Sequence, residues 1–262
     1  MTDWTDRDGV CELRLAAPPL NEIGQSMLRA LERFVEHAVA SKPRAVIVYS
    51  DLPRGFCAGA DLRELHHGIK GRTYAEYRAE LASFLDRIHA VANRLDALPC
   101  TTVGVVHGAC FGGGFELALT MDVLVADTTA RFCFPELRLG LIPGFGGIPR
   151  LARELPNAVI RDLLLTGRSL GARRAYELGL VSQVVRRGEG LNVAREVAAQ
   201  SARFAPEVVA SAKAFMKPIP TADLEREKAL FLSMFADGRV ARALAAFDAS
   251  TEKMPYLPAG DA

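Results

Sequence analysis

Two glutamates lie in stretches of the sequence that otherwise consist mainly of small and apolar residues. Glu116 follows three consecutive glycines in GACFGGGFELA (108–118), and Glu136 lies in FCFPELRLGLIPGFGG (132–147). A carboxylate in such surroundings either pairs with a cation, such as Arg138, or has a raised pKa that lets it exchange a proton near neutral pH. Glu116 could equally be a first-turn acid that the helix dipole stabilises. Taken alone, each glutamate is compatible with acid–base chemistry or with a structural role.

Two glycine-containing segments could supply backbone N–H groups to a ligand. The stretch GFCAGADL (55–62) consists largely of small residues, which let the main chain approach a bound molecule. The glycines at 112–114 are costly in chain entropy, and one reason for them is a helix start whose unpaired N–H groups face a developing anion. The structural alternatives are a tight connection in which Asp61 caps a helix, and close packing of a helix on a sheet.

Taken together, these three segments resemble the crotonase superfamily, the enoyl-CoA hydratase/isomerase family. The shared patterns are F-x-A-G-A-D-L, G-x-x-x-G-G-G-x-E-L-A and P-E-x-x-L-G-L-I-P-G-x-G-G, in this order. The resemblance implies that the N–H groups of Ala58 and Gly113 form an oxyanion hole for the thioester carbonyl of an acyl-CoA. It implies that Glu116 activates a water for attack on C3 and that Glu136 gives a proton to C2.

The resemblance also indicates the reaction and the residues that surround the substrate. Family isomerases commonly keep only the second acid, so the presence of both favours reversible hydration of a trans-2-enoyl-CoA to a 3-hydroxyacyl-CoA. No metal or separate cofactor is expected, because coenzyme A is part of the substrate. The expected substrate-binding residues are Ala58, Gly59, Ala60 and Asp61 in the first loop, Phe134 and Phe145 around the acyl group, and Phe231 and Phe247 near the CoA.

The elements that must position these residues follow an α/β pattern. Short β-branched runs that end in turn residues predict strands at 11–15, 45–49, 101–106 and 123–126. Apolar residues at three- and four-residue spacing predict helices at 23–39 and 74–98. From about residue 191 the strand signal disappears, and amphipathic segments follow at 193–204, 207–216, 224–235 and 240–251.

We therefore expect a core of residues 1–190 and a helical region of residues 191–262. From periodicity alone, the helical region either packs on the core or also builds a subunit interface. The resemblance implies a spiral of β-β-α units whose C-terminal helices mediate a homotrimer, or a dimer of trimers.

Composition and charge argue against some other classes of function. The 262 residues carry a net charge of +1, with 24% charged and 50% hydrophobic residues, which is ordinary for a globular protein. This balance, without a long lysine-rich helix, argues against an RNA-binding or scaffolding homologue. The five cysteines form no C-x-x-C pair, the N-terminus lacks a signal-peptide pattern, and charges interrupt the apolar stretch 101–126. A cytoplasmic protein that does not enter a membrane is expected.

Alternatives with the same fold are an acyl-CoA isomerase, a dehydratase or a C–C hydrolase that uses the same oxyanion hole. The pair His66 and His67 is expected in a polar surface loop without a metal.

Overall fold

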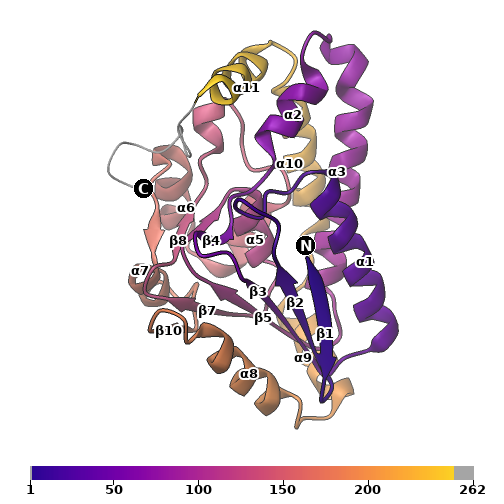
Figure 1. Cartoon of the computed structure of the whole chain (residues 1–262), viewed down its shortest axis with the longest axis vertical. Helices are drawn as coiled ribbons and strands as arrows, with labels where there is room; N and C mark the ends of the chain where they lie inside the picture. The colour runs from indigo at the N-terminus through magenta and orange to yellow at the C-terminus, as the bar shows by residue number, and fades with distance from the viewer. Residues whose placement is uncertain (1, 251–262) are drawn as a thin grey trace.

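The chain forms two sheets that helices surround (Figure 1). The computed structural model describes residues 2–250. A six-stranded sheet has the order β1 (Asp3–Arg7), β2 (Val10–Leu15), β3 (Ala45–Ser50), β5 (Thr101–Val106), β7 (Val123–Asp127), β10 (Gln183–Val185). A four-stranded sheet has the order β4 (Gly55–Cys57), β6 (Ala109–Phe111), β8 (Arg131–Cys133), β9 (Leu170–Gly171). The predicted α/β class is confirmed.

Successive pairs of strands alternate between the two sheets, which winds the chain into a spiral. β3, β5 and β7 belong to the larger sheet, and each is followed at once by a strand of the smaller one, namely β4, β6 and β8. Within each sheet these neighbours pair in parallel, for example Val46 with Thr102 and Cys57 with Cys110. The arrangement agrees with the β-β-α spiral that the resemblance implied.

The smaller sheet brings the three sequence motifs together. β4 pairs with β6, and β6 pairs with β8, so the three strands run side by side in one direction. The segments 58–61, 112–116 and 135–136 follow directly on these strands. Because ligands bind outside the carboxyl ends of parallel strands, this edge of the sheet is the expected place for a site.

Helices cover the sheets with their apolar faces. α1 (Gln25–Ser41) buries Met27, Leu31 and Phe34 from the predicted stripe, and α3 (Tyr74–Asp96) lies beside it. The remaining helices before the C-terminal region are α2 (Leu62–Ile69), α4 (Gly113–Ala118), the 3-10 helix η1 (Glu136–Leu139), α5 (Gly147–Glu154), α6 (Asn157–Thr166) and α7 (Ala172–Glu177). Between residues 2 and 250, no helix is long and apolar enough to cross a membrane.

After β10 the described chain is helical, as the periodicity predicted. The helices are α8 (Gly190–Ser201), α9 (Pro206–Met216), α10 (Thr221–Ser233) and α11 (Arg239–Ala249). Ala194 and Ala198 of α8 share a buried cluster with Ile47, Val103 and Val125 of the larger sheet. α8 thus packs on the larger sheet of the core, although it belongs to the helical region expected after residue 190. Residue 251, the expected end of the last helix, lies outside the described residues.

Candidate active site

A small pocket lies where the three motif segments meet. Its volume is about 50 Å³. The wall includes Ala60 from the first segment, Gly113 and Glu116 from the second, and Glu136 and Phe145 from the third. The structure therefore brings together both predicted catalytic carboxylates and part of each predicted binding loop.

Glu116 is held by the backbone of the loop that precedes α5. The carboxylate is 3% exposed, and its Oε1 accepts hydrogen bonds from the N–H groups of Phe145 and Gly147, both at 2.7 Å. Burial raises the pKa of Glu116 to about 7, while these N–H groups and the nearby Arg150 act in the opposite direction. A carboxyl group with such a pKa can take up and release a proton near neutral pH.

Glu136 lies in a different electrostatic environment. Its Oε2 is buried and has no hydrogen-bond partner among residues 2–250. Burial raises the pKa of Glu136 well above its ordinary value, and the proximity of Glu116 adds to this shift. Arg138, the alternative partner on sequence grounds, donates from Nη2 to the carbonyl of Gly167 at 2.8 Å. These surroundings favour the neutral, proton-carrying form of Glu136.

The structure corrects one half of the predicted oxyanion hole. The N–H of Ala58 donates to the carbonyl of Leu20 at 2.9 Å, so it is not available to a substrate. Gly59 has a left-handed backbone with φ of +99° and turns the chain, so that the amide of Ala60 faces Gly113. Within the described chain, the N–H groups of Ala60 and Gly113 have no hydrogen-bond acceptor. Ala60 and Gly113 are therefore the pair whose amides can bind an oxyanion.

A second, larger cavity of about 270 Å³ adjoins the first. Its wall is mainly apolar and comes from α2, α3 and the start of α1, with Leu81 and Phe84 among its residues. Ala60, Leu65, Phe145 and Phe231 line both cavities. The ring of Phe145 packs on Gly113, where a Cβ would lie 2.7 Å from two ring carbons. Phe145 thus stands between the oxyanion hole and the apolar cavity.

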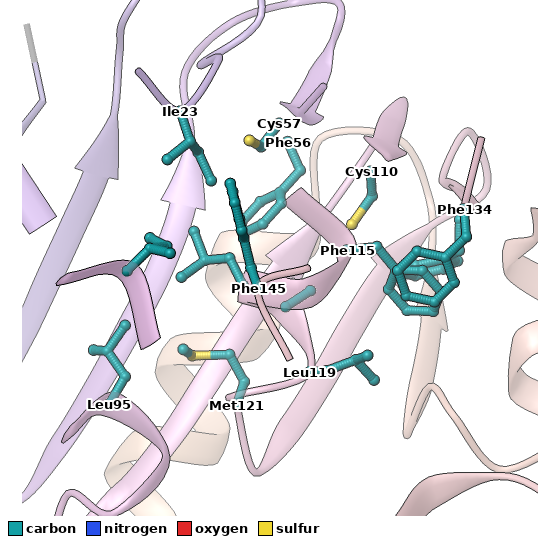
Figure 2. Packing of buried hydrophobic residues seen from close by; sticks show 14 of the residues in the cluster. Ile23, Phe56, Cys57, Leu95, Cys110, Phe115, Leu119, Met121, Phe134 and Phe145 are labelled. Atoms are coloured by element: carbon teal, nitrogen blue, oxygen red, sulfur yellow. The ribbon is translucent and has the colours of Figure 1, made fainter. Parts of the chain in front are cut away.

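Phe134, predicted beside Phe145 in the acyl pocket, has a different position. Its side chain is fully buried and stacks on Phe115 at 4.7 Å between ring centroids. Figure 2 shows Phe134 next to Phe115 and apart from Phe145. In the described part of the chain, Phe134 lines neither cavity. The acyl-pocket prediction is therefore kept for Phe145 alone.

The two aromatic residues predicted near the CoA also differ in position. Phe231 of α10 lies in the wall of both cavities. Phe247 of α11 packs against the guanidinium of Arg63, 5.1 Å from its ring centroid, and lines neither cavity in residues 2–250. A role in binding CoA stays a prediction for both residues.

The expectation of a polar loop around His66 and His67 is wrong. Both residues belong to α2, His66 is buried, and its Nδ1 lies 2.9 Å from Oδ2 of Asp248 on α11. His67 Nε2 lies 3.3 Å from the same oxygen. Asp248 is 182 residues away from His66 in the sequence, so local patterns carry no signal of this contact.

Sequence reasoning missed three buried polar residues beneath the site. Arg150 is fully buried and pairs with Asp96 at 3.0 Å, His89 lies 2.8 Å from the carbonyl of Gly144, and Glu227 of α10 is 6% exposed. Each sits within a helical pattern of ordinary composition. The available signal was a charged residue at a position where the helix periodicity places an apolar one, as Glu227 lies three residues after Leu224 and four before Phe231.

Comparison with known proteins places this geometry in a family. Residues 5–255 match the family model described as enoyl-CoA hydratase/isomerase. Carnitinyl-CoA dehydratase of Proteus mirabilis is 35% identical over 210 residues, which cover 80% of this chain and 77% of that protein. A probable enoyl-CoA hydratase of Mycobacterium bovis, echA8, is 36% identical over 208 residues, which cover 77% and 76%.

Solved structures agree on the fold. Enoyl-CoA hydratase from Bacillus halodurans superposes with a TM-score of 0.83 at 19% identity, covering 94% of this chain and 99% of that one. A putative enoyl-CoA hydratase from Streptomyces coelicolor has a TM-score of 0.76 at 27% identity, with 94% and 90% covered. On the family match and these relatives, the chain belongs to the enoyl-CoA hydratase/isomerase family, the crotonases.

Proposed function

We propose that this protein catalyses the reversible addition of water to a trans-2-enoyl-CoA, giving a 3-hydroxyacyl-CoA. The observation that carries the proposal is that the buried Glu116 and Glu136, whose Oε2 is buried, line one small cavity beside the amides of Ala60 and Gly113, which have no acceptor among residues 2–250. Glu116 has N–H donors that favour its ionised form, whereas Oε2 of Glu136 has no donor in the described part of the chain. One group is thus suited to accept a proton and the other to give one.

In the hydration direction, Glu116 takes a proton from the water that attacks C3 of the substrate. The electron pair of the C2–C3 double bond moves toward the thioester, and negative charge develops on the carbonyl oxygen. The N–H groups of Ala60 and Gly113 stabilise this charge. Glu136 then transfers its proton to C2, and the reverse sequence of steps eliminates water.

The hydration rate should fall as the pH is lowered below about 7, by about tenfold per pH unit. The reason is that Glu116 must be ionised to accept the proton, and its pKa of about 7 makes the acid form dominant below that pH. Burial and the neighbouring Glu116 raise the pKa of Glu136 well above its ordinary value, which favours its proton-carrying form. A profile of kcat/KM between about pH 4 and about pH 9 measures this. An acidic limb at the ordinary glutamate value of 4.5 would contradict the assignment.

The experiment that tests the function is a substrate panel on the purified protein. Crotonyl-CoA, longer enoyl-CoAs and the matching 3-hydroxyacyl-CoAs should be assayed in both directions, because a dehydratase runs the same steps in reverse. Carnitinyl-CoA dehydratase among the relatives makes the elimination direction a specific second candidate. Turnover of enoyl-CoA and hydroxyacyl-CoA at the same site supports the proposal. Double-bond migration or C–C cleavage without any hydration would replace it.

We also propose that the chain assembles as a homotrimer, or a dimer of trimers, through its C-terminal helices. α9 exposes apolar side chains, with Val208 64%, Phe215 89% and Met216 74% exposed in the single chain. Exposed apolar side chains gathered on one helix indicate an interaction surface. α10 and α11 bury Phe231, Leu232 and Leu244 against the rest of the same chain.

Replacing Phe215 by Asp should therefore lower the assembled mass toward that of the 28.3 kDa chain, because a charge in a subunit contact is costly to bury. Light scattering coupled to size exclusion measures the mass. Leu165→Asp is the control, since Leu165 on α6 is 71% exposed but lies on another helix. An unchanged mass for Phe215→Asp would place the interface elsewhere.

The five cysteines are buried, and no disulfide joins them among residues 2–250. Cysteines kept as thiols fit a reducing compartment, and we propose the cytoplasm.

A further inference from the structure

Residues 144–148 comprise the end of the loop before α5 and the first two residues of that helix, and we call them the loop 144–148. Two buried glutamates accept hydrogen bonds from successive amides of this segment. The N–H groups of Phe145 and Gly147 donate to Glu116, both at 2.7 Å. The N–H groups of Gly146 and Ile148, which lie between and after them, donate to Glu227 at 2.8 Å each. From residue 145 to residue 148, the odd-numbered amides thus donate to Glu116, and the even-numbered ones donate to Glu227.

The carbonyl groups of the same loop are also held by buried side chains. His89 Nε2 lies 2.8 Å from the oxygen of Gly144. Nη1 of Arg150 donates to the carbonyls of Phe145 and Gly146, at 3.2 and 3.3 Å. Side chains of α3 and α5 thus hold the carbonyl groups of the loop, while the two glutamates hold its N–H groups.

Glu227 is placed to act on this loop and not on the substrate. Unlike Glu116 and Glu136, it lines neither of the two cavities in the described chain. Its two oxygens are used by different amides, Oε1 by Gly146 and Oε2 by Ile148. Gly146 has a left-handed backbone with φ of +99°, so the alternation of the amides depends on a conformation that other residues rarely adopt.

We propose that Glu227 is a positioning residue that fixes the loop 144–148, and through it the carboxylate of Glu116 and the ring of Phe145. Glu227 acts from α10, whereas the groups it positions belong to α4 and the loop before α5. The consequence for activity rests on the function proposed above, since a displaced Glu116 would misplace the attacking water. Misplacement by about 1 Å of a group in the reacting constellation can lower a rate about 10²-fold.

The test is Glu227→Gln, in which a single amide oxygen remains as acceptor and an NH₂ group faces one of the loop amides. Hydrogen–deuterium exchange followed by mass spectrometry should show faster exchange in the peptide that carries residues 144–151, without faster exchange in the strands of the larger sheet. With the best substrate of the wild type, kcat should fall about 10–100-fold while KM changes little, since the apolar cavity is kept. Glu227→Asp keeps both oxygens but is shorter, so its values should lie between those of Gln and wild type.

Glu225→Gln is the matched control, because Glu225 lies on the same helix and is exposed. Its carboxylate forms a surface ion pair with Lys228 at 2.7 Å. Unchanged exchange of the loop peptide in a folded Glu227→Gln or Glu227→Asp overturns the proposal, whether or not the wild type hydrates an enoyl-CoA. Should Glu227→Gln fail to fold, Glu227→Asp supplies the same two measurements. Absence of hydration by the wild type would instead contradict the proposed function and leave the exchange result decisive for Glu227.

Discussion

Glu116→Gln and Glu136→Gln are each expected to lower kcat for the best enoyl-CoA by about 10²–10⁴-fold, the usual scale for a lost general base or acid. An amide at 116 cannot take the proton of the attacking water, although its oxygen can still accept from Phe145 and Gly147. An amide at 136 cannot deliver a proton to C2. Because the two variants keep the size of the side chain, the cavity should keep its shape.

Steady-state kinetics and a direct measurement of acyl-CoA binding separate chemistry from binding. The dissociation constant of the product should change little in both variants, while kcat falls. Glu36→Gln is the control, because Glu36 lies on the exposed side of α1 and away from both cavities. Turnover like that of the wild type in either site variant would end the two-carboxylate mechanism.

The long elements could be predicted from the sequence because each leaves a local signal. The strand at 101–106 is marked by a run of β-branched residues that ends in a turn, and the helix beginning at residue 74 by apolar residues at helical spacing. β4, β6 and β8 escaped prediction because three residues are too few for a period to be visible. These short strands nevertheless position the site. The expectation that the three motifs lie together therefore rested on the family resemblance, and not on the predicted strands and helices.

The error at the oxyanion hole has a conformational cause. Ala58 and Ala60 are both small residues in the same loop, and the sequence alone does not show which amide is already bonded. The amide of Ala58, directly after β4, donates to the carbonyl of Leu20, and the left-handed backbone at Gly59 then redirects the chain. A glycine permits this turn but does not reveal its direction.

Contacts between distant segments account for most of what was missed. Phe134 and Phe145 lie on either side of Glu136 in one stretch of the sequence, yet Phe134 stacks on Phe115 in the core and Phe145 lies in the wall of both cavities. Glu227 bonds to Gly146 across 81 residues. Such contacts depend on how α10 packs over the loop. A short stretch of sequence carries no information about that packing.

The position of Phe145 leads to the second large effect. Phe145→Ala should raise the specificity constant for bulky acyl groups relative to crotonyl-CoA by about ten- to two-hundredfold, the scale of about 1–3 kcal/mol for an apolar specificity contact. The ring lines both the space of about 50 Å³ at the carboxylates and the apolar cavity of about 270 Å³. Removing it would join the two and give a long or aromatic acyl chain a path past Gly113.

Phe134→Ala is the matched control for this change, because it removes the same side chain from a fully buried position that lines neither cavity. Both variants should lose stability, about 3–5 kcal/mol for a truncated core phenylalanine, but only Phe145→Ala should alter the ratio of specificity constants. The measurement is kcat/KM for short, long and aromatic enoyl-CoAs beside the melting temperature of each variant. Equal ratios in Phe145→Ala and wild type, together with a large loss of stability, would show that Phe145 is an ordinary core residue. A changed ratio in Phe134→Ala as well would mean that loosening of the core, and not an opened path, sets the acyl preference.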